Sequence, residues 1–207
     1  MTLHAPRERA GSKGGTLRFL LHLARAIDRF ADVVGILTAV LTFVMILVGA
    51  WNVFGRFIGR AVGENLTSNA LLEWQWYLFS VVFLLGGAYV LRHNEHVRVD
   101  VVYARMPPRK RAWVNLLGSA LFLIPFCIIV LDVAWDWFML SYGIKESSPD
   151  PGGLPRYPVK FLVVVGFVLL LIQGISELIK SAAILTGHLQ EEEKDAIEQL
   201  KAEVEQV

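Results

Sequence analysis

The chain has 207 residues, of which 55% are hydrophobic and only 19% are charged, and its formal net charge is +1. A soluble domain would mix apolar with polar residues at helical or strand periods, whereas here the apolar residues come in long uncharged blocks. This pattern excludes a separate soluble domain and predicts an integral membrane protein.

Four uncharged blocks are long enough, or nearly so, to cross about 30 Å of hydrocarbon as helices that rise about 1.5 Å per residue. In lipid the backbone must satisfy its own hydrogen bonds. We therefore predict an all-α fold in which residues 33–180 form a four-helix transmembrane domain. The predicted spans lie at about residues 33–54, 71–91, 110–141 and 158–179.

The segment before the first span divides into two parts. Residues 1–15 are polar and contain glycine, which predicts a disordered cytoplasmic tail. In residues 16–32, Arg18, His22, Arg25 and Arg29 share one helical face and apolar residues the other, which predicts an amphipathic helix lying in the membrane interface. The alternative is that this segment continues the first span as a protruding stalk.

The distribution of charge predicts the orientation. Most of the 20 Lys and Arg residues lie before the first span, in the connection at residues 92–111, or after the fourth span. Cytoplasmic connections carry this excess, so we predict a multi-pass protein of the bacterial inner membrane with both termini in the cytoplasm. Tryptophan residues near the predicted span ends mark the interfaces independently.

Three further segments have predicted conformations. Pro125 predicts a kink in the third span. The connection at residues 143–158 is rich in proline and glycine, which predicts a rigid, non-helical outer loop. Residues 181–207 are acidic and predict a short cytoplasmic tail helix.

Few residues have a pattern that could support catalysis. The single cysteine, Cys127, cannot form an internal disulfide, and we expect it to be a small core residue. All five histidines lie outside the predicted spans, which disfavours haem binding, and His93 and His96 lack a third metal ligand nearby. No catalytic motif is present. We predict no enzyme activity, no catalytic residue, and no cofactor or metal.

A transporter that works alone would show ionisable residues or broken helices at mid-membrane. Here the carboxylates of the spans lie near predicted span ends, so we interpret the chain as a helical bundle that works with partners. The alternatives are an accessory anchor of a respiratory or other membrane complex and a small membrane-embedded enzyme. The bilayer is an expected partner, and nucleic acid is not.

Several phrases resemble the small membrane subunit of tripartite ATP-independent periplasmic (TRAP) transporters, the DctQ family. They are Glu73-Trp74 early in the second span, GGAYVLR at residues 86–92, HVRVD at residues 96–100 and PPR at residues 107–109. NVFGRF at residues 52–57 and SPDPGGLP at residues 148–155 resemble two further phrases of that family. The resemblance covers about residues 30–180.

The resemblance implies a part in sodium-driven uptake of an organic acid or a related solute. In such systems a periplasmic solute-binding protein captures the solute, and a large membrane subunit carries the substrate and sodium sites and moves as an elevator. The small subunit braces the large subunit and helps to dock the binding protein. These two proteins are therefore the expected partners.

The resemblance also suggests residues with structural or subunit-contact roles. Arg98 and Asp100 are expected to order the inner loop, and Arg56 and Glu73 the outer side. The alternative is that they are ordinary interface charges. The full set of candidates is Arg56, Glu73, Trp74, Arg92, His96, Arg98 and Asp100.

Overall fold

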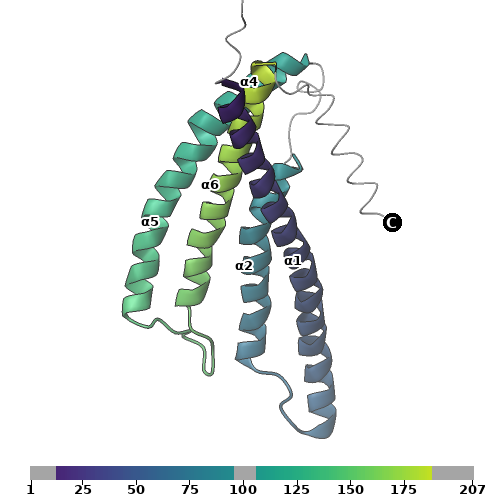
Figure 1. Cartoon of the computed structure of the whole chain (residues 1–207). Coiled ribbons are helices and arrows are strands. Elements are labelled where there is room, and N and C mark those ends of the chain that lie inside the picture. The colour runs from purple at the N-terminus through teal and green to yellow at the C-terminus, as the bar shows by residue number, and fades with distance from the viewer. Residues whose placement is uncertain (1–12, 96–105, 188–207) are drawn as a thin grey trace, which may run out of the picture.

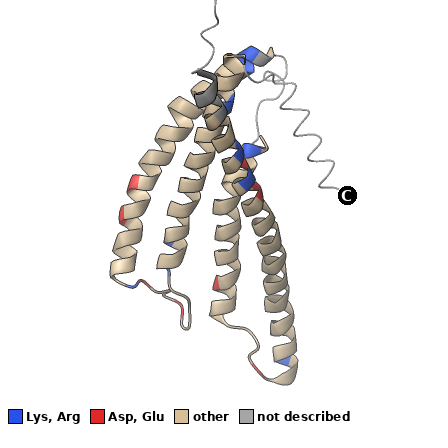
Figure 2. Cartoon of the chain, viewed as in Figure 1, with Lys and Arg blue, Asp and Glu red and all other residues tan. Residues whose placement is uncertain are grey.

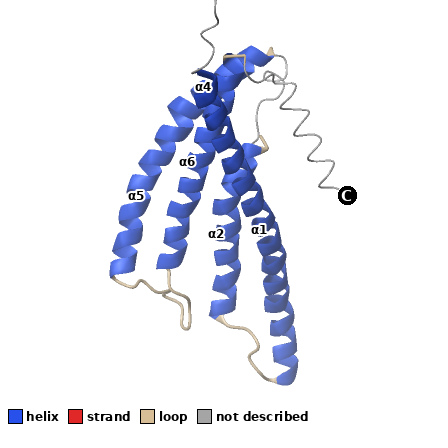
Figure 3. Cartoon of the chain, viewed as in Figure 1, coloured by secondary structure: helices blue, strands red, loops and turns tan. Residues whose placement is uncertain are grey.

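The structure is a computed structural model, and it describes residues 13–95 and 106–187. Apart from an isolated bridge between Ser147 and Pro155, the regular structure of this part is helical (Figure 3). The elements are α1 (Lys13–Val62), α2 (Asn69–Arg92), α4 (Pro108–Gly118), the π-helix η1 (Ser119–Leu123), α5 (Ile124–Gly143) and α6 (Tyr157–Leu185).

Four helices are long and apolar enough to cross a membrane, which confirms the predicted all-α, four-span fold. They cover Phe19–Val62, Asn69–Arg92, Arg109–Gly143 and Tyr157–Leu185. The predicted tail at residues 1–15 lies mostly outside the described residues, although α1 already includes residues 13–15. The predicted tail helix at residues 181–207 also lies largely outside them, and α6 extends through Leu185.

The helices lie side by side in a row rather than in a closed square (Figure 1). α5 packs on α6, α6 on α2 and α2 on α1, and α1 also reaches α6. A row has two broad faces, so many large apolar side chains of the spans are exposed, such as Phe43 and Phe83. In a membrane protein such faces contact lipid or other subunits.

α1 is one helix of 50 residues. The prediction of a separate interfacial helix at residues 16–32 differs from this, because α1 has no break near residue 32. Ala24 and Ala31 are buried and Asp28 bonds to α6, so this segment packs on the bundle. The continuous helix corresponds to the alternative considered above. At about 1.5 Å per residue, α1 is far longer than the hydrocarbon layer is thick.

The third span is irregular one turn before Pro125. In η1 the backbone follows a π-helix, and the amide of Ile124 donates to the carbonyl of Ser119. Pro125 has no N–H, and its ring would collide with the carbonyl of residue 121 in a regular helix. A widened π turn just before proline relieves this collision. On the N-terminal side of η1, α4 lies across the end of α6 (Figure 1).

Close packing in the middle of the row depends on glycine. A Cβ at Gly166 of α6 would lie 2.9 Å from both the Cβ and the carbonyl oxygen of Leu84 in α2. Small residues allow helix backbones to approach closely in lipid. Gly166 therefore sets the distance between the two central helices.

The two ends of the row differ in charge (Figure 2). Lys and Arg gather at the end that holds α4, the first turns of α1 and the last turns of α2 and α6, which we call the basic end. The opposite end holds the turn at residues 63–68 and the loop at residues 144–156, and we call it the loop end.

Candidate functional site

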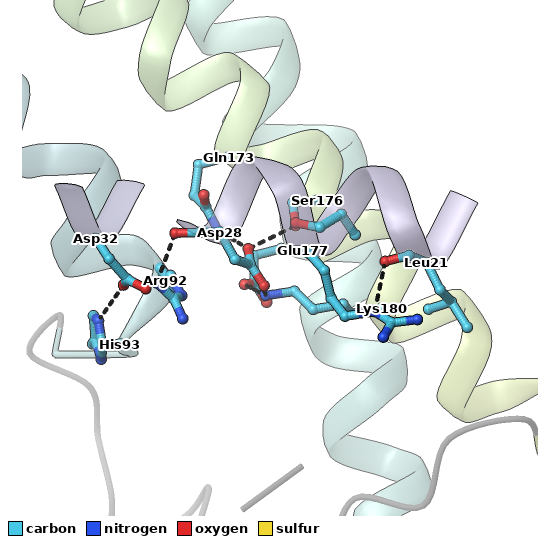
Figure 4. A network of polar contacts seen from close by, with 11 residues as sticks. Leu21, Asp28, Asp32, Arg92, His93, Gln173, Ser176, Glu177 and Lys180 are labelled. Carbon is cyan, nitrogen blue, oxygen red and sulfur yellow. Dashed lines mark hydrogen bonds and ion pairs between the residues drawn. The ribbon is translucent and has the colours of Figure 1, made fainter. Parts of the chain in front are cut away.

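Polar side chains form a cluster at the basic end, where α1 meets α6. Three residues of α6 surround the carboxylate of Asp28 (Figure 4): the Gln173 amide and the Ser176 hydroxyl each donate to Oδ1 at 2.9 Å, and Lys180 Nζ lies 3.2 Å from Oδ2. Residues three and four positions apart lie on the same face of a helix, so α6 presents all three together. Lys180 is also paired with Glu177.

The second half of this cluster joins α1 to α2. The guanidinium of Arg92 is almost fully buried, donates to the carbonyl of Asp28 at 2.6 Å and is paired with Asp32. His93 Nε2 lies 3.2 Å from Asp32 Oδ1. Arg92 is in the last turn of α2, where a positive charge also interacts favourably with the helix dipole. The carboxylate of Asp28 therefore holds α6 and that of Asp32 holds α2, while the backbone carbonyl of Asp28 also accepts from α2.

The cluster is suited to holding helices together. Burying a charge in a medium of low dielectric is costly unless the charge is paired and hydrogen-bonded. Each carboxylate of the cluster, Asp28, Asp32 and Glu177, has a cationic partner. Among the described residues no group of His, Cys, Asp and Glu has an arrangement suited to a metal ion. The arrangement thus ties three helices into one unit.

A second cluster lies at the loop end and centres on Glu73 of α2. Its buried carboxylate accepts hydrogen bonds from the hydroxyl of Ser148 and from the backbone amide of Leu154, and Arg156 lies 3.8 Å away. A Cβ at Gly153 would lie only 2.9 Å from Glu73 Oε1, so glycine is needed where the loop closes over the carboxylate. Glu73 thereby holds the loop between α5 and α6 against α2.

Further bonds hold the same loop. The Tyr77 hydroxyl donates to the carbonyl of Pro155 at 2.6 Å, and the Asn69 amide donates to that of Pro151 at 3.1 Å. Glu146 of the loop is paired with Lys160 of α6 and accepts from the hydroxyl of Ser141 in α5 at 2.6 Å. The hydrogen bond from Lys160, followed by that from Ser141, lowers the pKa of Glu146 below its usual value.

The residues predicted from the sequence lie in different parts of the structure. Glu73 and Arg92 are buried, one in each cluster, whereas Trp74 is half exposed on α2. Arg56 is exposed and lines a shallow pocket of about 360 Å³ with Arg60, so the structure does not bring it to Glu73. His96, Arg98 and Asp100 lie outside the described residues. The subunit-contact roles of all seven stay predictions.

Sequence reasoning missed most of the basic-end cluster. None of Asp28, Asp32, Glu177 and Lys180 was predicted to have a role. A signal was available, because residues 173, 176, 177 and 180 are polar at helical spacing at the end of an apolar span. The spacing identifies the polar face of α6. It does not identify Asp28, which this face contacts, because Asp28 lies in another helix.

The central part of the chain can be compared with known proteins. The family profile described as tripartite ATP-independent periplasmic transporters, DctQ component, matches residues 45–183. The chain belongs to this family. The DctQ match covers α2, α4, η1, α5, most of α6 and the later part of α1. No solved structure matches the chain.

Two similar proteins agree with the assignment to the DctQ family. A putative TRAP transporter small permease protein of Haemophilus influenzae is 23% identical over 159 residues, which are 77% of this chain and 91% of that protein. The ectoine TRAP transporter small permease protein TeaB of Halomonas elongata is 25% identical over 170 residues, 81% and 86% of the two chains. Together with the four apolar helices, the family indicates a multi-pass inner-membrane protein of a transporter complex.

Proposed function

We propose that this DctQ-family chain braces the large elevator subunit of a TRAP transporter and helps to dock the periplasmic binding protein. The transporter would carry out sodium-driven uptake of an organic acid or a related solute. The observation that carries the proposal is the position of the polar contacts. The polar contacts lie at the two ends of the row, and at each end the charged groups are paired within the protein. The spans between these ends are apolar.

Bracing requires a unit that does not deform when its partner moves. The basic-end cluster connects α1, α2 and α6, and Glu73 connects α2 to the loop between α5 and α6. Three spans are therefore linked at the basic end, and α2 is linked to the loop between α5 and α6 at the loop end. The broad apolar faces of the row offer a wall on which a large subunit can pack within the membrane.

Docking requires an ordered surface outside the membrane. The loop at residues 144–156 is held by Glu73, Tyr77 and Asn69, while its tip at residues 149–152 is exposed. A surface that is already ordered loses less conformational entropy when a partner binds. This supports a role of the loop in meeting the binding protein.

Reconstitution tests the bracing role. The large subunit is placed in vesicles with and without this chain, its solute-loaded binding protein is added outside, and uptake is measured under an inward sodium gradient. We expect uptake only when both membrane subunits are present, and none when potassium replaces sodium. Undiminished uptake by the large subunit alone would contradict the bracing role.

A further inference from the structure

The outer side of α5, at one edge of the row, is an exception to the apolar character of the spans. It carries Asp132 and Asp136, which are one helical turn apart and exposed. α5 packs on α6, and its buried Ala134 lies two residues from each aspartate, or about 200° around the helix. The two carboxylates therefore face away from the bundle.

Both carboxylates lie within the membrane-spanning length of α5, away from its two ends (Figure 2). The helix ends at Gly143, and Asp136 and Asp132 lie about 10 and 16 Å inside that end. Lys160 Nζ, the first charge of α6, is 4.4 Å from the ring centroid of Trp137. Asp132 lies about 7.5 Å deeper than Trp137. Lysine can extend its charge to the membrane surface from such a depth, but the short side chain of aspartate cannot.

These two aspartates are also exceptional in their lack of partners. Neither side chain has an ion pair or a hydrogen bond within residues 13–95 and 106–187. The other carboxylates of the four spanning helices are all paired, namely Asp28, Asp32, Glu73 and Glu177. An ionisable residue in a membrane span is costly unless it is paired, and it generally marks a functional contact. A cation of another molecule would remove this cost.

The opposite edge of the row has no such requirement. It is formed by α1, which has no charged residue between Asp32 and Arg56 and exposes apolar side chains such as Phe43 and Ile46. Lipid can cover this edge without burying a charge. Of the two edges, α5 is therefore the one that calls for a protein partner.

An apolar groove of about 400 Å³ lies beside the two carboxylates. Its lining belongs to α5 and includes Ile129, Val133 and Trp137. A groove along a helix admits side chains of a second helix that packs against it in the membrane. The edge thus combines a recess for apolar side chains with two negative charges, which complement a helix that is apolar apart from one cation.

We propose that the large subunit packs on the α5 edge and that one of its membrane helices places a lysine or arginine beside Asp132 and Asp136. This rests on the proposed bracing role. Residues one turn apart on a helix face are about 5–6 Å apart, so one guanidinium can bridge both carboxylates. Such a pairing fixes the height at which the two subunits meet. A second copy of this chain fits less well, because a symmetric contact brings identical carboxylates together.

Site-specific crosslinking in the assembled transporter tests which edge is covered. The photoreactive p-benzoylphenylalanine replaces Ile129 of α5 or, as the matched control, Ile46 of α1, which are 64% and 59% exposed. We expect adducts with the large subunit from position 129 to exceed those from position 46 by about tenfold. Large-subunit adducts from position 46 alone would overturn the proposal. So would adducts at position 129 that have the mass of a phospholipid or of a second copy of the chain.

Neutral variants test the charges themselves. Asp132→Asn combined with Asp136→Asn removes both charges with little change in shape, and Glu64→Gln, at an exposed carboxylate outside the spans, is the control. The large subunit should dissociate from the double variant about tenfold faster than from the unmodified chain, and from the control at an unchanged rate. The thermal midpoint of the isolated double variant should not fall, because neither aspartate has a partner within the described chain.

Charge reversal identifies the partner residue. Asp132→Lys should prevent assembly, and a glutamate in place of the lysine or arginine in the crosslinked large-subunit peptide should restore it. If the double variant formed the complex and released the large subunit at the normal rate, the contact would be wrong and the bracing role would stand. If the unmodified chain did not retain the large subunit at all, both would fail.

Discussion

Asp28 Oδ2 of α1 lies 3.2 Å from Lys180 Nζ of α6, although 152 residues separate them in the chain. Both side chains are largely buried, and Glu177 pairs with the same ammonium group. This contact connects the first span to the last at the basic end, although α2 lies between them in the row.

Removing the ammonium group should destabilise the bundle. Lys180→Met leaves the carboxylates of Asp28 and Glu177 buried without that cation, and losing one partner of a buried pair costs about 3–5 kcal/mol. The free energy of unfolding is measured by titration with a denaturing detergent in mixed micelles. Adding Asp28→Asn to this variant should recover part of the loss, because the pair acts as a unit.

The control for this pair is an exposed cation away from the cluster. Arg60→Met, near the loop end of α1, should change the free energy of unfolding by no more than about 0.5 kcal/mol. If Arg60→Met lowered the free energy of unfolding as much as Lys180→Met, the pairing of Lys180 with Asp28 and Glu177 would contribute nothing specific to stability.

Glu73→Gln should loosen the loop at residues 144–156. A glutamine has one acceptor oxygen where the carboxylate has two, so it cannot accept from both Ser148 and Leu154 in the same way. Amide hydrogen exchange of residues 148–154 is expected to rise, by about tenfold, with little change in the α6 segment at residues 161–176. Affinity for the binding protein should fall in the same variant.

A substitution of the neighbouring residue, Trp74, is the control for Glu73→Gln. Trp74→Phe changes a half-exposed side chain that makes no bond to the loop, so loop exchange should stay as in the unmodified chain. If Glu73→Gln loosened the loop but bound the binding protein with unchanged affinity, the order of the loop would not matter for docking. This would contradict the proposed role of the loop.

Acid should weaken the contact between Glu146 and Lys160. The folded state lowers the pKa of Glu146 below 4.5 through the hydrogen bonds from Lys160 and Ser141. A group with a lowered pKa stabilises the fold above its unfolded pKa, and this stabilisation is lost as the pH falls through the folded value. Protection of the loop amides, which is the intrinsic exchange rate at each pH divided by the observed rate, should therefore fall as the pH falls below about 4.5.

Glu146→Gln tests the assignment of this titration. The variant lacks the carboxyl group, so protection of the loop amides should already be lower at neutral pH and should lose most of its dependence on acid. Protection that responds to acid equally in the variant and in the unmodified chain would assign the titration to another group.

Cysteine labelling measures the predicted orientation. Cys127 is the single cysteine and is buried, so Cys127→Ala gives a background for new cysteines. A maleimide confined to the periplasm should modify Asp150→Cys in the outer loop and not Arg109→Cys at the basic end. The reverse pattern would place the basic end outside and would invert the orientation.

The sequence by itself determined the membrane class, the four spans and the family phrases. Whether a segment crosses a membrane depends on its own length and apolar content, so local patterns suffice. The row arrangement and the partners of Asp28, Asp32 and Glu73 required the tertiary structure, because each contact joins helices or loops far apart in the chain. The start of α1 shows the same limit. Its basic face predicted an interfacial helix, but packing of Ala24 and Asp28 against α6 made it part of one continuous helix.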